Sequence, residues 1–112
     1  MVETGLIYEK IEVTGDIPIS RFGHTMTIIG KHKVVLFGGA TGDAGKFSMT
    51  GDTYIFNTIK HCWLKVNPQG ILPSPRAAHA TAVIESMQMV LYGGATGGNS
   101  HLIIYRWEFS FR

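Results

Sequence analysis

The sequence contains one cysteine, Cys62, in 112 residues, so no disulfide can form within the chain and a cysteine-based metal site would lack its other ligands. Such scarcity is typical of a reducing compartment and predicts a location in the cytoplasm or the nucleus. No apolar run approaches the ~18 residues of a membrane span, and the N-terminus has no signal-peptide pattern, so no membrane contact is expected. The basic residues are scattered without a Lys/Arg block, which argues against nucleic acid as a partner.

Charged residues are also few, at 16% against 45% apolar residues, which excludes a disordered chain and indicates one small folded domain. Glycine is abundant instead, with 14 copies in a chain rich in Val, Ile, Thr, Tyr and Phe. This combination is typical of short strands joined by tight turns.

The sequence repeats itself with an offset of 55 residues. Residues 21–24 (Arg-Phe-Gly-His) correspond to residues 76–79 (Arg-Ala-Ala-His), and Tyr8 corresponds to Trp63. Residues 35–42 and 90–97 share seven identities in eight positions without a gap. A match of this kind in so short a chain indicates a structural repeat rather than chance.

Four segments of the first period have the composition of short strands. They are residues 24–29, 33–37, 53–56 and 62–66, each bounded by Gly, Asn, Asp or Pro. Four strands in ~50 residues is the arrangement of a β-propeller blade. The glycine pair that follows the second segment predicts a place where a neighbouring blade crowds the backbone.

These motifs resemble the kelch repeat, in which a strand with Arg-x-x-His is followed by a strand ending in Gly-Gly, a strand with Tyr, and then a Trp. The sequence supplies Arg21, His24, Gly38, Gly39, Tyr54 and Trp63 in one period, and Arg76, His79, Gly93 and Gly94 in the next. The resemblance implies an all-β fold, a fragment of a kelch-type β-propeller with about two four-stranded antiparallel blades and an incomplete ring.

The chain is expected to be one partial propeller in three pieces. Residues 7–13 are interpreted as the last strand of a preceding blade, residues 21–66 as a complete blade and residues 76–112 as an incomplete one. In the incomplete blade, Trp107 and Phe109 are expected at the places of Tyr54 and Phe56. No counterpart of Asp52 precedes them, so the sequence predicts no convincing third strand and no fourth.

Propellers need ~4–8 blades to close, so two blades leave apolar edges exposed. The chain is therefore expected to be part of a larger protein, or a protomer that completes a ring with copies of itself. Three copies would give six blades.

A second, finer resemblance rests on residues 21–27, 36–41 and 73–80. The residues of these motifs resemble the first kelch blades of plant and protist serine/threonine phosphatases with an N-terminal kelch domain. This resemblance implies a regulatory or substrate-recruiting part of such an enzyme. The phosphatase metal-ligand runs Gly-Asp-x-His and Gly-Asn-His-Glu are absent, so this chain itself is predicted not to be an enzyme.

The repeated arginines and histidines are the first candidate site residues. Arg21 and Arg76 are interpreted as guanidinium groups that bridge backbone carbonyls between blades, with contact to an anionic ligand as the alternative. His24 and His79 repeat without an acidic or cysteine partner, which favours structural hydrogen bonding over metal ligation. No metal site is expected.

The aromatic residues and the glycine loops are also interpreted as structural features and not as ligand sites. Tyr54 and Trp63 are expected to pack between blades rather than stack on a ligand. Residues 38–46 do not form a phosphate-binding loop, because Ala40 stands at the first glycine position and Phe47 replaces the Ser or Thr. The sequence therefore predicts no cofactor.

The longest loop of the blade, residues 40–51, is the candidate binding surface. It carries Asp43, Lys46, Phe47 and Met49 and is expected to share one end of the blade with residues 14–20 and 67–75. Loops on a rigid scaffold often carry recognition, so a contact surface for a protein partner is predicted, with a tip of no contact role as the alternative.

The leading functional hypothesis is a protein-protein interaction module. One alternative is an enzyme built on a kelch propeller, such as an oxidase, which would require Tyr, His and Cys ligands clustered at the axis. The other is a structural fragment without independent function.

Overall fold

The computed structural model describes residues 5–43, 45–96 and 104–110, and within these ranges it contains strands and no helix. The all-β fold class is therefore confirmed. Within the same ranges, no helix is long and apolar enough to cross a membrane. The strands are β1 (Thr14–Gly15), β2 (Thr25–Ile29), β3 (Lys33–Phe37), β4 (Ala40–Asp43), β5 (Lys46–Met49), β6 (Thr53–Asn57), β7 (Cys62–Val66), β8 (Ala80–Ile84), β9 (Gln88–Tyr92) and β10 (Tyr105–Glu108).

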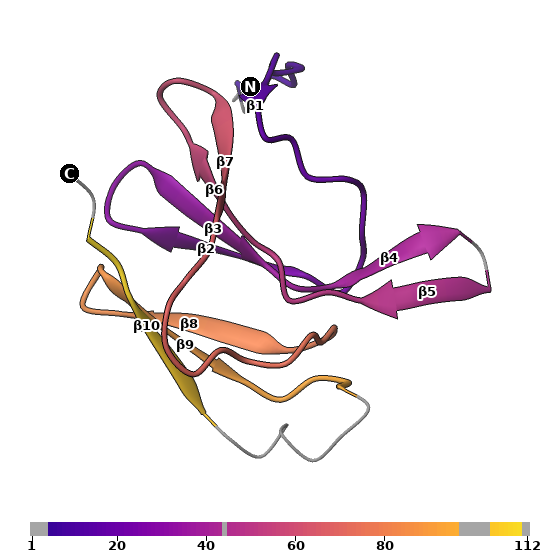
Figure 1. The fold of residues 1–112 in the computed structure, drawn as a ribbon. Coiled ribbons are helices and arrows are strands. Elements are labelled where there is room, and N and C mark those ends of the chain that lie inside the picture. The colour runs from indigo at the N-terminus through magenta and orange to yellow at the C-terminus, as the bar shows by residue number, and fades with distance from the viewer. Residues whose placement is uncertain (1–4, 44, 97–103, 111–112) are drawn as a thin grey trace.

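The first period forms one sheet, called blade one, in the order β1-β7-β6-β3-β2 (Figure 1). Strands β2, β3, β6 and β7 make an antiparallel meander, and each coincides closely with a segment predicted from sequence. The short strand β1 adds to the outer edge in parallel with β7. The predicted four-stranded blade is thus present, with one extra short strand.

The second period forms a three-stranded antiparallel sheet, called blade two, in the order β10-β9-β8. Its third strand, β10, pairs with β9 over four residues, so the prediction that this blade lacks a convincing third strand is wrong. Residues 97–103, which connect β9 to β10, lie outside the described residues.

The register of β10 also corrects the predicted correspondence between the blades. Tyr105 lies opposite Leu91 just as Tyr54 lies opposite Leu36, so Tyr105, and not Trp107, occupies the place of Tyr54. Trp107 takes the place of Phe56. The offset falls from 55 to 51 because the connection between the second and third strands is four residues shorter in blade two.

The hydrophobic core lies between the two blades. Its buried members are Ile29, Val35, Phe37 and Ile55 from blade one, and Met89, Leu91 and Trp107 from blade two. Alternation along each strand directs these side chains to one face of each sheet. Burying a side chain of this size contributes roughly 1.5–3 kcal/mol, so this layer is the main source of stability between the blades.

Polar contacts reinforce the same interface. The Gly39 amide donates to the Arg76 carbonyl over 2.8 Å, and the Ala78 amide donates to the Gly23 carbonyl over 2.7 Å. A Cβ at Gly38 would lie 2.8 Å from the Arg76 carbonyl oxygen. The predicted crowding by the neighbouring blade is therefore confirmed at Gly38, whereas a Cβ at Gly39 would meet Phe22 and His24 of its own blade.

Residues 7–13 form no strand in the structure and are mostly exposed. They lie on the side of blade one away from blade two, where no further blade is present among the described residues (Figure 1). Their assignment as the last strand of a preceding blade stays a prediction.

Candidate protein-binding surface

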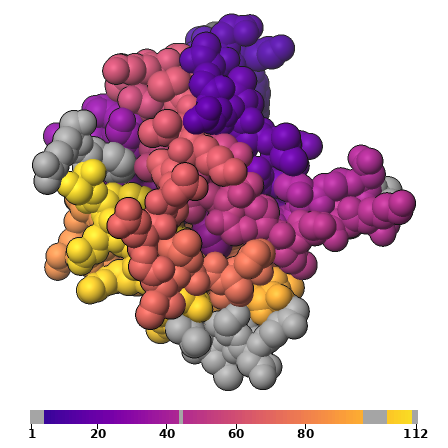
Figure 2. All heavy atoms as spheres, viewed as in Figure 1, coloured from indigo at the N-terminus to yellow at the C-terminus, as the bar shows by residue number. Residues whose placement is uncertain are grey.

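The candidate binding loop is not irregular but folds into a two-stranded antiparallel hairpin, β4 and β5. Figure 2 shows this hairpin standing out from the body of the molecule as an arm. At Gly42 the backbone has φ +121, and a Cβ there would collide with the carbonyl oxygen of Lys46. Glycine at this position therefore permits the two strands to approach each other.

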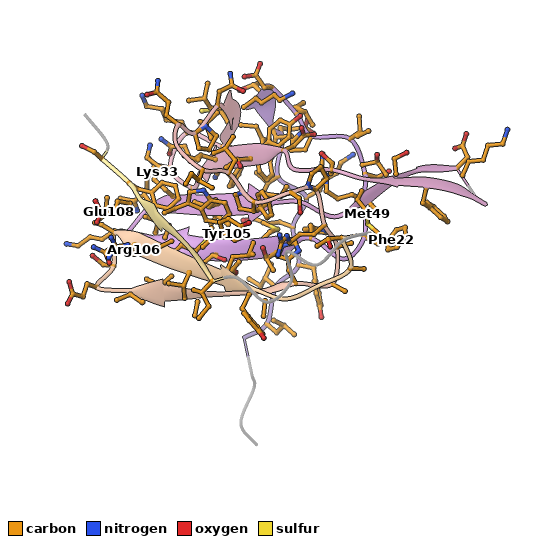
Figure 3. All side chains as sticks on the ribbon, turned by 60° about the horizontal axis from the view of Figure 1, so that its bottom comes forward. Phe22, Lys33, Met49, Tyr105, Arg106 and Glu108 are labelled. Carbon is orange, nitrogen blue, oxygen red and sulfur yellow. The ribbon has the colours of Figure 1, made fainter. Side chains whose placement is uncertain are left out.

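Phe22, Phe47 and Met49 gather at the hairpin and are called the hairpin patch. The Phe22 and Phe47 rings meet edge to face, with centroids 4.9 Å apart. Their exposed fractions are 52%, 51% and 43%, which is high for side chains of this size and hydrophobicity. Figure 3 shows Phe22 and Met49 side by side at the base of the hairpin.

The base of the patch is fixed by backbone pairing. Phe22 and Ala40 form an isolated antiparallel bridge, with reciprocal hydrogen bonds of 3.1 and 2.8 Å. The patch belongs to blade one alone, because Ala77 stands in blade two where Phe22 stands in blade one. A feature that is absent from the second repeat is not required by the blade architecture.

Two predicted site residues, Asp43 and Lys46, lie opposite each other on β4 and β5. Opposite charges in directly facing positions stabilise an antiparallel pair by roughly 0.2–1 kcal/mol. Both side chains are exposed, and their pair lies one position further toward the hairpin tip than the pair of Gly42 and Phe47. The structure thus brings together three of the predicted binding residues, Asp43, Lys46 and Phe47.

Arg21 and Arg76, by contrast, are buried away from the hairpin tip. Arg21 donates to the Gly38 carbonyl over 3.2 Å, and Arg76 donates to the Gly93 carbonyl over 3.1 Å. These two bonds run within one blade and not between blades, where the interpretation placed the carbonyl partners. In each blade, the strand that follows the arginine pairs with the strand that ends at the glycine pair. The carbonyl of the first glycine therefore lies within reach of the arginine side chain. Their role as ligand contacts stays a prediction.

The aromatic neighbours of the two arginines repeat as well. The Arg21 guanidinium lies 5.4 Å from the ring centre of Tyr54, and that of Arg76 lies 5.3 Å from Tyr105. Tyr54 also meets Trp63 edge to face, at 6.4 Å. The equivalent arginine–tyrosine contacts independently support the register in which Tyr105 corresponds to Tyr54.

His79 lies in the interface between the blades. Its Nε2 is 2.9 Å from the Thr25 hydroxyl of blade one, and its ring lies against Phe37. Burial lowers the pKa of His79 below its ordinary value, and the positive charge of Arg76 acts in the same direction, while the Phe37 carbonyl opposes them. The neutral imidazole is therefore the form that this interface favours.

A pH dependence of stability follows from the lowered pKa of His79. Below about pH 6.5 the unfolded chain gains a proton at this residue before the folded chain does, so acid weakens the fold by at most ~1.4 kcal/mol per pH unit. We expect the stability difference between the wild type and His79→Gln to shrink as the pH falls from 7.5 to 5. Urea unfolding across this range measures it, with the exposed His32→Gln as reference. A difference that stays constant would contradict the prediction.

Sequence reasoning missed the hairpin and the contact of Phe22 with Phe47. The facing charges of Asp43 and Lys46 around Gly45 were the available signal for the hairpin. Phe22 carries no such signal, because it lies 25 residues before Phe47 and in another strand region.

Comparison with known proteins supplies the family context. A family model described as the "KLHDC2/KLHL20/DRC7 Kelch-repeats domain" matches residues 3–110. The Rho GTPase-activating protein gacHH of Dictyostelium discoideum is 34% identical over 85 residues, covering 76% of this chain and 5% of that protein. Acyl-CoA-binding domain-containing protein 4 of Arabidopsis thaliana is 33% identical over 91 residues, covering 81% and 13%.

The host cell factor homolog hcf-1 of Caenorhabditis elegans is 35% identical over 96 residues, covering 80% of this chain and 12% of that protein. The chain thus spans no more than 13% of the length of these three relatives. The similarity concerns the repeats and not the remainder of those proteins.

Proposed function

The chain belongs to the kelch-repeat family, and from that premise we propose that it is a protein-interaction module whose contact surface is the hairpin patch. Kelch repeats supply a rigid scaffold, and the loops at one end of the blades are free to vary and to bind. The observation that carries the proposal is the exposure of Phe47 and Met49 on the hairpin and of Phe22 at its base, since none of the three belongs to the core between the blades.

The composition of the hairpin patch suits a protein partner. Aromatic residues and methionine are enriched in the centres of protein interfaces, and charged residues are found at their rims. Here Asp43 and Lys46 form the charged pair next to Phe47 in the same hairpin, while the rings of Phe22 and Phe47 meet edge to face. We propose a partner that inserts an apolar side chain between the rings and Met49.

A quantitative capture experiment tests this surface. We expect Phe47→Ser and Phe22→Ser to reduce binding of partners from a lysate of the source organism by at least about tenfold, because a central aromatic side chain often contributes 2 kcal/mol or more. The matched control is Ile59→Ser, since Ile59 is 65% exposed and lies in the turn between β6 and β7. Partners retained by both phenylalanine variants would contradict the proposed surface.

The parent protein is a separate question, because the relatives share kelch repeats and differ in the activities that their names state. The repeats alone do not specify an activity. The comparisons give no support to a phosphatase parent, and a phosphatase role remains a prediction that the full-length transcript would test. We also propose a location in the cytoplasm or the nucleus, because the one cysteine, Cys62, is free.

The oxidase alternative is poorly matched by the side chains. Within the residues that the structure describes, no three His, Cys, Asp or Glu side chains lie close enough together to hold a metal ion. Cys62 lies at the outer edge of blade one, opposite Asn57, whereas His24 and His79 directly precede β2 and β8. No observation therefore favours a kelch-based oxidase over an interaction module.

The open faces of the two blades support the further proposal that the chain assembles with copies of itself. Met26 and Ile28 of blade one are 55% and 62% exposed on the face that points away from blade two. Tyr92 and Ile84 of blade two are 50% and 40% exposed on its outer side. Exposed apolar side chains on two opposite faces suit head-to-tail contact between blades.

A further inference from the structure

Blade two has an open outer edge. In blade one the third strand, β6, is covered on its outer side by the fourth strand, β7. In blade two the third strand, β10, pairs with β9, and no strand among the described residues covers its other side. An uncovered edge presents unpaired backbone groups that another strand can bind.

The N-terminal segment has the pattern of the missing strand. Residues 7–11 (Ile-Tyr-Glu-Lys-Ile) stand 55 residues before β7 (Cys-Trp-Leu-Lys-Val) and share its lysine and its alternation. Ile7 and Tyr8 are 82% and 90% exposed, and the segment forms no strand in its own chain. It lies next to β1 and β7, far from β10 of the same chain (Figure 1). Within one copy the segment is therefore not placed to pair with β10, but a second copy could bring it there (Figure 1).

We propose that residues 7–11 of one copy supply the fourth strand of blade two in another copy. The inference rests on the self-assembly proposed above and specifies its contact. Residues 12–20 would then lead from the donated strand into blade one of the donor, just as residues 67–75 lead from β7 into blade two. Because each copy holds two blades, a closed propeller would contain two to four copies.

The pairing in blade one fixes the register of the donated strand. Ile55 lies opposite Leu64, and Phe56 lies opposite Trp63. Each residue of β6 corresponds to the residue 51 positions later, in β10, and each residue of β7 corresponds to the residue 55 positions earlier, in the segment. This correspondence places Glu9 opposite Arg106 and Tyr8 opposite Trp107.

The pair of Glu9 and Arg106 is the strongest support for a second copy as the donor. The same place in blade one holds two apolar residues, Ile55 and Leu64. Both members are replaced by charged residues here, and the two charges are opposite. Facing charges of opposite sign stabilise strand pairing, whereas either charge facing an apolar residue would not. The Arg106 side chain is 61% exposed and lies 3.7 Å from the Glu108 carboxylate of the same strand, an exposed ion pair that Glu9 would join or replace (Figure 3).

A groove beside β10 suits the tyrosine of the donated strand. It measures about 290 Å³ and lies between β7 and β10, with Ile55, Leu64, Val66 and Trp107 among its lining residues. In blade one the Trp63 ring packs on Phe56, with centroids 4.9 Å apart. Tyr8 of the donor would pack on Trp107 in the same way, with its ring in this groove.

Gly70 provides a second, independent observation. In blade one Gly15 has φ +88, and a Cβ there would collide with the Trp63 carbonyl of the fourth strand. Gly70, its equivalent, has φ +106 although a Cβ would meet nothing within 4 Å. The donated strand would bring the Tyr8 carbonyl to this place, which explains a glycine there.

Charge reversal in the full chain tests the inference. We expect the wild type to assemble in sedimentation velocity, and Glu9→Arg or Arg106→Glu each to weaken assembly about tenfold or more. An equimolar mixture of the two variants should assemble again, as open chains or as rings with an even number of copies, because opposite charges face each other wherever the two variants alternate. Glu12→Arg is the matched control, since Glu12 lies beyond the paired residues and should have no effect.

Cross-linking tests the register itself. On a Cys62→Ser background, Glu9→Cys with Arg106→Cys should form a disulfide between copies, whereas Glu9→Cys with Glu108→Cys should not. A wild type that stays monomeric at about 100 µM, or variants whose mixture does not recover assembly, would overturn the inference. Partner capture that depends on Phe47 would survive either result, so failure here is distinguishable from failure of the hairpin surface.

Discussion

Replacing Phe37 with alanine is expected to lower the free energy of unfolding by about 3–5 kcal/mol. Phe37 is 1% exposed, and its ring lies 4.9 Å from that of Trp107 and 5.2 Å from that of His79, both in blade two. Truncation would leave a cavity in the layer that joins the two sheets. Urea unfolding followed by tryptophan fluorescence measures the loss.

The repeat offers a matched control for this variant. Tyr92 stands in blade two where Phe37 stands in blade one, at the same place in the second strand, but it is 50% exposed. In the monomer, at concentrations below those of self-assembly, Tyr92→Ala is expected to cost less than about 1 kcal/mol, because little surface is buried there. Equal losses for the two variants would show that the face of blade one does not pack on blade two.

Replacing Gly38 with alanine is the second large effect that we expect. The backbone at Gly38 has φ +71, and a Cβ there would lie 2.8 Å from both the Arg76 carbonyl oxygen and the His79 ring. Alanine would add roughly 1–2 kcal/mol of backbone strain and a further 1–3 kcal/mol from overpacking. The combined loss should be visible as a lower midpoint of urea unfolding.

Gly93→Ala separates these two contributions. Gly93 occupies the same place in the motif with φ +83, yet a Cβ there would meet nothing within 4 Å. This variant should show the backbone strain alone. If Gly93→Ala proved as costly as Gly38→Ala, crowding by the neighbouring blade would not explain the glycine at position 38.

The strands of blade one could be predicted from sequence because the signals agree there. Composition, alternation and turn residues indicate the same four segments, and the repeat confirms their boundaries. The first two strands of blade two follow by the offset of 55, since the ladders of β2 with β3 and of β8 with β9 contain five pairs each.

The third strand of blade two could not be predicted from the same signals. Tyr105, Trp107 and Phe109 stand at every second position, so all three lie on the same face of the strand. Shifting the strand by two residues keeps this face unchanged, so the pattern does not choose between registers. Because the connection before this strand is shorter in blade two, the offset of 55 does not indicate which of the three aromatic residues corresponds to Tyr54. Only the position of β10 against β9 decides that Tyr105 corresponds to Tyr54.

The candidate surface was predicted in part. The loop and three of its exposed residues, Asp43, Lys46 and Phe47, were predicted to form a binding surface from its length and composition, and this role stays a prediction. Its hairpin geometry was not, because Gly42 and Asp43 are poor strand formers and the strands are held by facing pairs rather than by a buried face. Phe22 could not be linked to Phe47, since their contact depends on the bridge between Phe22 and Ala40.

The central claim is that the two repeats are consecutive blades packed face to face, and a double-mutant cycle between Phe37 and Trp107 tests it most directly. These rings belong to different blades and lie 4.9 Å apart. We predict that Phe37→Ala and Trp107→Ala are coupled by about 1 kcal/mol in the free energy of unfolding. Additive losses, with no coupling between the two variants, would contradict the packing of blade one on blade two.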